Sequence, residues 1–136
     1  MLTRSRLVPL ALATLLVGGG TAAATTASAA TQGSQVIQSC YGNAENYTAT
    51  GNGVDAAYWP GTGFKYTTGN CADINVKVNY SRKVRVCWKY IECDSWVQAY
   101  KGQWKVVNKE HADVPDGWGF YLEFSGGNNG TGQAAY

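Results

Sequence analysis

The clearest pattern along the chain is an alternation of apolar and polar residues in its centre. Within 73–80 every second residue is apolar, and the alternation resumes over 84–90 after a break at Ser81-Arg82-Lys83. Successive side chains of a strand point to opposite faces of a sheet, so a period of two is typical of half-buried strands. We predict a hairpin of these two strands, with Arg82 and Lys83 at its tip.

Shorter segments on both sides share this character. Phe64–Thr68 is rich in aromatic and β-branched residues, which favour strands. Trp96–Ala99 and Trp104–Asn108 flank a turn centred on Lys101-Gly102, and they predict a second hairpin.

The C-terminal third begins with the turn sequence Val114-Pro115-Asp116-Gly117. The following strand, over 118–124, carries large apolar residues on one face, namely Trp118, Phe120, Leu122 and Phe124. A glycine-rich tail follows, and we expect residues 134–136 to form a last edge strand. The polar stretch 31–58 shows little periodicity and predicts an extended arm with loops.

These elements indicate an all-β fold, a small antiparallel β-sandwich or barrel of six to eight strands. The expected organisation is a signal peptide over 1–30, an N-terminal arm over 31–58, and a β domain over 59–136.

The N-terminus has the features of a secretion signal. Arg4 and Arg6 precede an apolar run over 7–17, and small residues lead to an A-x-A type cleavage site, with cleavage near Ala29 or Ala30. The run is shorter than the roughly 20 residues that span a bilayer, so we expect an exported protein without membrane insertion. Removal of both arginines leaves nine basic and nine acidic residues, and this balance argues against nucleic acid as a partner.

Four cysteines lie in the exported part, at positions 40, 71, 87 and 93. An even number in a short exported chain favours two disulfides. Three pairings are possible, and we favour Cys40–Cys71 with Cys87–Cys93, because the second pair closes a short loop between neighbouring strands. With one histidine and no C-x-x-C pair, the sequence predicts no zinc site and no cofactor.

Candidate catalytic chemistry is sparse. His111 is the single histidine, and with Glu110 and Asp113 beside it we expect a solvated loop residue. The spacing of the acidic residues selects no pair for glycoside hydrolysis. The chain is therefore predicted to be non-enzymatic.

Charge distribution indicates a binding surface instead. Five basic residues and no acid lie between 77 and 89, namely Lys77, Arg82, Lys83, Arg85 and Lys89. In the predicted hairpin they form a basic projection that fits an acidic cleft of a protein partner. The alternative is that these side chains only keep the protein soluble and prevent pairing of strand edges. The segment 110–123 is acidic and carries no Lys or Arg.

Five tryptophans offer further binding chemistry. Trp88 and Trp118 fall on predicted core faces, whereas Trp59, Trp96 and Trp104 are expected at the surface, where rings stack on sugars or anchor protein interfaces. Three tyrosines of the arm suggest docking by strand addition or groove filling, and the alternative is an arm that folds back on its own sheet. They are Tyr41, Tyr47 and Tyr58.

The order of several motifs resembles a family of small exported actinobacterial β-sandwich proteins with two disulfides. The motifs are Cys40-Tyr41-Gly42, Cys71 to Lys77, Val84 to Trp88, Trp104 to Val107 and Val114 to Gly117. Within that group the chain is similar to the small adaptor subunits of umbrella toxin particles, secreted antibacterial assemblies that act on competing bacteria.

This resemblance implies a protein that joins the repeat ring of a large polymorphic toxin chain to a lectin-bearing subunit. It implies that Arg82, Lys83 and Arg85 enter an acidic cleft of a repeat. The arm from Val36 through Ile37 to Tyr41 would face the lectin-bearing subunit.

Two other function classes compete. Cys71-Ala72, Val76-Lys77-Val78 and Tyr80 resemble the tendamistat-type α-amylase inhibitors, which present a Trp-Arg-Tyr triplet; here the nearest triplet is Trp88-Lys89-Tyr90. A free-standing carbohydrate-binding module would instead use Trp59, Trp96 and Trp104 as an exposed platform.

Overall fold

The computed structural model describes residues 39–136, so Val36, Ile37 and the predicted signal peptide lie outside the described residues. A short helical segment covers 39–42 and nine strands follow. The strands are β1 (Glu45–Gly51), β2 (Ala56–Trp59), β3 (Lys65–Tyr66), β4 (Asn75–Val78), β5 (Arg82–Trp88), β6 (Val97–Ala99), β7 (Trp104–Val106), β8 (Gly119–Ser125) and β9 (Gly130–Ala135). In this described part, no helix has the length and apolar character needed to cross a membrane.

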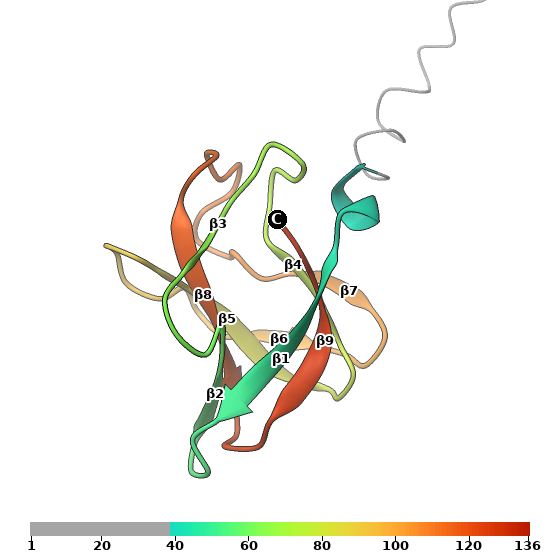
Figure 1. The fold of residues 1–136 in the computed structure, drawn as a ribbon, viewed down its shortest axis with the longest axis vertical. Coiled ribbons are helices and arrows are strands. Elements are labelled where there is room, and N and C mark those ends of the chain that lie inside the picture. Colours follow the sequence, from blue (N-terminus) through green and yellow to red (C-terminus); the bar gives the residue numbers. More distant parts are fainter. Residues whose placement is uncertain (1–38) are drawn as a thin grey trace, which may run out of the picture.

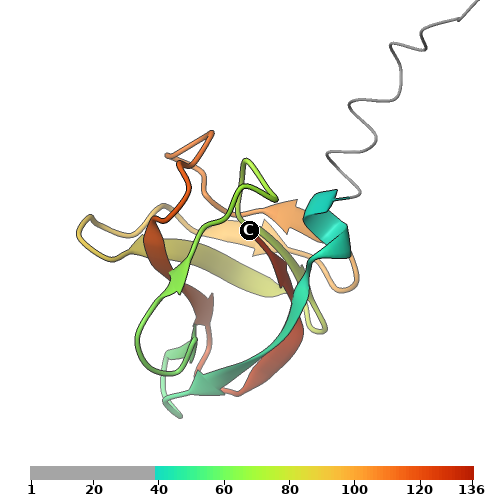
Figure 2. The same ribbon diagram turned by 45° about the horizontal axis from the view of Figure 1, so that its top comes forward.

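All strands pair antiparallel in the order β6-β5-β8-β2-β1-β9-β4-β7, and β3 pairs with β8. The sheet curls into a nearly closed barrel, as Figures 1 and 2 show. We call β1, β9, β4 and β7 the first wall and β2, β8, β5, β6 and β3 the second wall. β1 joins the walls, since its first part pairs with β9 and its end pairs with β2. The predicted all-β class is confirmed.

The core consists of the inward-facing residues of both walls. On the second wall the alternation of β5 and β8 is confirmed, because the even-numbered residues of 84–86 and 120–124 are fully buried. On the first wall Val76 and Val78 are buried in the same way. Burial of each such side chain contributes about 1.5–3 kcal/mol, so these alternating positions supply most of the driving force for folding.

The predicted pairing of both hairpins is wrong. β4 pairs with β7 and β9, and β5 pairs with β6 and β8, so the chain crosses between the two walls at 79–81. It crosses again between β6 and β7, where Gly102 has a φ of 74° and donates its N–H to the Val78 carbonyl. Alternation determines which face of a strand is buried, but it does not determine which strand lies beside it.

The predicted arm requires a similar correction over its second half, which forms β1 and β2. In β1 the buried Tyr47 and Ala49 alternate with exposed polar residues, so a period of two is present but rests on one small and one aromatic side chain. The glycine-rich tail is also corrected, because β9 lies between β1 and β4 and is not an edge strand. Gly132 allows the close approach of two groups there, since a Cβ at this position would clash with the Lys77 carbonyl oxygen of β4 and would lie 2.6 Å from the Tyr47 hydroxyl oxygen.

Both predicted disulfides are confirmed. Cys40–Cys71 ties the helical segment at 39–42 to the loop before β4, and Cys87–Cys93 closes the loop that follows β5. Two disulfides in a small domain are consistent with an exported protein.

Candidate functional site

The five predicted basic residues lie in three separate parts of the barrel. Lys83, Arg85 and Lys89 share the outer face of the second wall, because they occupy alternate positions along and just beyond β5. Arg82 has the opposite parity and Lys77 lies on the first wall. The predicted basic projection therefore does not exist, and Lys83, Arg85 and Lys89 lie instead on the outer face of one wall.

Arg82 has a structural role. Its side chain lies on the core side at one end of the barrel, where Nε and Nη2 donate to the Ser125 carbonyl at 3.0 and 2.5 Å. Nη2 also donates to the Gly126 carbonyl at 2.8 Å, and the guanidinium lies 5.4 Å from the ring centroid of Phe124. Burial lowers the pKa of Arg82 from its ordinary value. These contacts make Arg82 a clamp on the turn between β8 and β9.

Arg85 is fixed from two sides on the outer face. Its guanidinium forms an ion pair with Glu123, with Nη2 2.7 Å from Oε2, and it lies 4.5 Å from the ring centroid of Trp96. Lys83 is exposed beside it. We call Lys83, Arg85, Lys89 and Trp96 the cationic face. It combines net positive charge with an aromatic ring, and both favour recognition of an acidic protein surface.

Lys89 extends this face toward an aromatic neighbourhood. Its ammonium donates a hydrogen bond to the Tyr66 hydroxyl at 3.1 Å and lies 5.6, 5.4 and 5.1 Å from the rings of Phe64, Tyr66 and Tyr90. Hydrogen bonding to the Tyr66 hydroxyl, and then to Tyr90, raises the pKa of the Lys89 ammonium. Cations are attracted to aromatic faces at this range.

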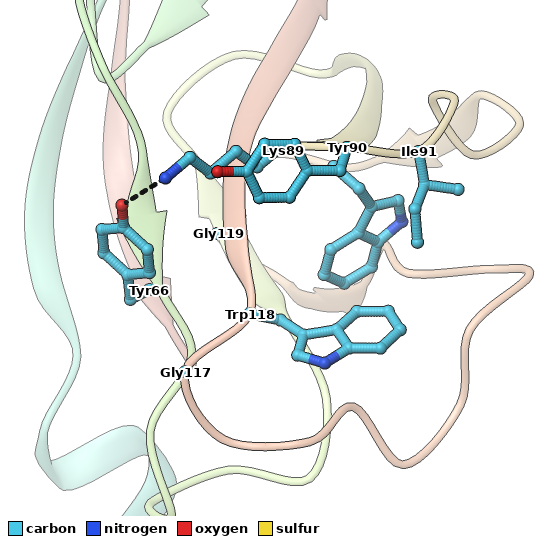
Figure 3. Close-up of a pocket in the computed structure, with 8 residues that line it drawn as sticks. Tyr66, Lys89, Tyr90, Ile91, Gly117, Trp118 and Gly119 are labelled. Atoms are coloured by element: carbon cyan, nitrogen blue, oxygen red, sulfur yellow. Dashed lines mark hydrogen bonds between the residues drawn. The ribbon is translucent and has the colours of Figure 1, made fainter.

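A pocket of about 450 Å³ opens beside Lys89 at the end of β5. Figure 3 shows it lined by Tyr66, Lys89, Tyr90, Ile91 and Trp118 together with glycine backbone, and Trp88 also contributes to the lining. We call it the end pocket. Sequence reasoning missed it, because its walls come from three segments that the predicted hairpins do not bring together.

His111 is not the solvated loop residue that we expected. Its Nδ1 lies 2.8 Å from Oδ1 of the buried Asp94, and its ring packs edge-on against Trp88 with the centroids 5.3 Å apart. Asp94 also accepts a hydrogen bond of 2.8 Å from the Trp88 indole. The Asp94 carboxylate thus holds Trp88 and His111 together beside the end pocket, and these contacts support the packing of the loop.

Lys77 and Tyr41 belong to a second cluster, on the first wall. The ring of Tyr41 stacks on Trp104 with the centroids 4.5 Å apart, and the Lys77 ammonium lies 5.0 Å from the Trp104 ring centroid. Tyr41 also donates a hydrogen bond to Oδ1 of Asn75 at 3.4 Å. We call Tyr41, Lys77 and Trp104 the first-wall cluster. It lies where the described chain begins.

The predicted tryptophan platform is not formed. Trp59 is buried in the core, Trp96 lies on the second wall and Trp104 lies on the first. Of the triplet Trp88-Lys89-Tyr90, Trp88 is only 4% exposed. Neither the sugar platform nor the inhibitor triplet is therefore presented as a surface.

The acidic residues of 110–123 do not form one surface either. Glu110 accepts a hydrogen bond from the Ser95 N–H at 2.8 Å, and hydrogen bonding with the side chain and then the backbone of Ser95 lowers the pKa of its carboxyl. Glu123 lies on β8 and pairs with Arg85. Each of these two carboxylates is therefore engaged within the domain.

No family model, curated protein or solved structure matches this chain.

Proposed function

We propose that this protein is a secreted, non-catalytic protein-binding module that acts as an adaptor in an antibacterial umbrella toxin particle. In this role it links the repeat ring of a large polymorphic toxin chain to a lectin-bearing subunit. The proposal combines the sequence resemblance with the surfaces described above.

The cationic face is the observation that carries the proposal. Arginine, tyrosine and tryptophan are the residues enriched at the centres of protein interfaces. Here Arg85 and Trp96 lie in contact and Lys83 is free beside them. An acidic cleft of the toxin repeat would receive Lys83, Arg85 and Lys89 from one wall of the barrel. Arg82 has no part in this contact, since its donors are used within the domain.

An adaptor needs a second surface that stays free while the first is occupied. The first-wall cluster meets this need, because Tyr41, Lys77 and Trp104 lie on a different wall from Lys83 and Arg85. We assign this cluster to the lectin-bearing subunit. Val36 and Ile37 remain part of the proposal for that contact, and they lie outside the described residues.

Affinity purification from culture supernatant tests the proposal. The tagged protein should recover a very large repeat-containing chain and a lectin-bearing chain, both identified by mass spectrometry. The double variant Lys83→Glu/Lys89→Glu should lose the large chain and keep the lectin-bearing one. The matched control Lys105→Glu/Lys109→Glu makes the same change of charge at two exposed lysines that are not part of the cationic face but line a neighbouring pocket with Trp96, and it should recover both chains.

Two outcomes would contradict the proposal. One is recovery of the tagged protein alone, without either chain. The other is inhibition of α-amylase by the purified protein, which would favour the inhibitor class.

A further inference from the structure

The end pocket continues the cationic face. Lys89 belongs to both, since its stem follows the outer face of the second wall and its ammonium lies at the pocket. A partner that covers Lys83 and Arg85 and extends along β5 therefore reaches the pocket. The question is which part of such a partner would fill it.

The backbone of β8 helps to position the Lys89 ammonium. A Cβ at position 119 would lie 3.0 Å from Cδ of Lys89 and 3.2 Å from Cε1 of Tyr66. Gly119 therefore lets the lysine stem lie close to β8 and brings the ammonium to the Tyr66 hydroxyl, 3.1 Å away. A cation held in this way loses less conformational entropy when it binds an anion.

The outer rim of the pocket is apolar and exposed. Tyr90 is 86% exposed and Ile91 is 50% exposed, and both lie in the loop closed by Cys87–Cys93. Exposed apolar groups around a pocket mark an interaction site. The disulfide closes this loop, and the hydrogen bond to Asp94 holds Trp88 below it.

The lining selects the chemistry of the ligand. Its rings and Ile91 suit an apolar side chain, and its single charged group, Lys89, suits an anion. Among the described residues that line the pocket there is no carboxylate or amide side chain to accept hydrogen bonds from sugar hydroxyls. The lining therefore favours an apolar protein group next to a carboxylate over a glycan.

We propose that the end pocket receives one anchor of the protein partner, an aromatic or branched aliphatic side chain with a carboxylate side chain next to it. This inference rests on the proposed function, because the partner that meets the cationic face is taken to supply the anchor. It adds a specificity element to the contact, since the partner must carry an apolar residue within its acidic surface.

Nuclear magnetic resonance titration of the secreted protein, with both disulfides formed, tests this inference. The probe is the capped peptide acetyl-Gly-Phe-Asp-Gly-amide, and the reporters are the indole N–H signals of Trp118 and Trp88. Replacement of Phe by Ala in the peptide should weaken binding by about tenfold or more, because the apolar burial is lost. Replacement of Asp by Asn should weaken it by about two- to fivefold, as expected for an exposed ion pair.

Variants of the protein locate the binding. Ile91→Ala and Tyr90→Ala truncate the exposed rim and should weaken binding of the Phe-Asp peptide. The Lys89→Met variant should bind the Asp and Asn peptides with equal affinity. Tyr100→Ala is the matched control, since Tyr100 is also exposed, at 58%, and lies outside the pocket. It should bind like the unmodified protein.

Two titration results would overturn the inference. In one, the Phe-Asp peptide leaves both indole signals unmoved or shifts them no more than the Ala peptide does. In the other, digalacturonic acid shifts them and the peptide does not, which would assign the pocket to an acidic saccharide. If the peptide binds in the titration but affinity purification recovers no partner, the end pocket is a binding site for such a side chain and the proposed function is refuted. Recovery of the partner that depends on Lys83 but not on Ile91 would refute the anchor in the end pocket and would keep the proposed function.

Discussion

Arg82 and Lys83 are neighbours in the sequence with opposite roles in the structure. In Arg82→Met the stem remains, but the donors to the Ser125 and Gly126 carbonyls are lost. Loss of the hydrogen bonds to two carbonyls costs about 1 kcal/mol each at this partly exposed site. Loss of the contact with the Phe124 ring adds about 0.5–1 kcal/mol. The free energy of unfolding should therefore fall by about 2–3 kcal/mol.

The assay is urea denaturation followed by circular dichroism, with thermal unfolding as a second measure. For a domain of this size the expected loss corresponds to a decrease in Tm of about 8–20 °C. The control Lys83→Met alters an exposed side chain and should change the free energy of unfolding by less than about 0.5 kcal/mol. The structural role of Arg82 would be refuted if Arg82→Met cost less than that, or if Lys83→Met cost as much as Arg82→Met.

Three further predictions concern stability. Gly132→Ala should destabilise the domain by about 3 kcal/mol or more, because its Cβ would clash with the Lys77 carbonyl oxygen and with the Tyr47 hydroxyl; Gly42→Ala, with open space around it, should be near neutral in the same urea titration. Burial raises the pKa of Tyr47, so the folded state holds its phenolic proton above pH 10 when the unfolded state releases it, and stability falls as pH rises. Tyr47→Phe should show a shallower decline above about pH 10, and an equal decline in both proteins would contradict this effect of burial. Removal of the Cys40–Cys71 disulfide, which spans 31 residues, should cost about 3–4 kcal/mol. Removal of Cys87–Cys93, which spans 6, should cost only about 2 kcal/mol, and the reverse order would argue against loop entropy as the main term.

The sequence predicted the buried face of each strand better than it predicted which strands pair. The alternation around Val84 and Phe120 was enough to predict which side chains enter the core, because a strand has a fixed period of two. It could not show that β4 and β5 lie on different walls, since an amphipathic strand can pair with any other of similar pattern. The assumed hairpin then put Arg82 at a tip, although its parity matches that of the buried Val84.

The candidate site was predicted only in part for the same reason. Lys83, Arg85 and Lys89 could be selected from their charge, and their common face follows from their spacing. The end pocket and the pair of His111 with Asp94 could not be predicted, because both are made by loops whose contacts span many residues. The glycines of β9 gave no strand signal, since glycine is a poor strand former, and Gly132 is required by the close approach of the Lys77 carbonyl and the Tyr47 ring.

The central claim is that the cationic face is the surface that binds the large partner chain. The most direct test is the equilibrium Kd of that chain for the unmodified protein, for Lys83→Glu/Lys89→Glu and for the control Lys105→Glu/Lys109→Glu, all shown to be folded. The first double variant should weaken binding by at least about tenfold, whereas the control should leave Kd unchanged. Equal Kd values for all three proteins would contradict it.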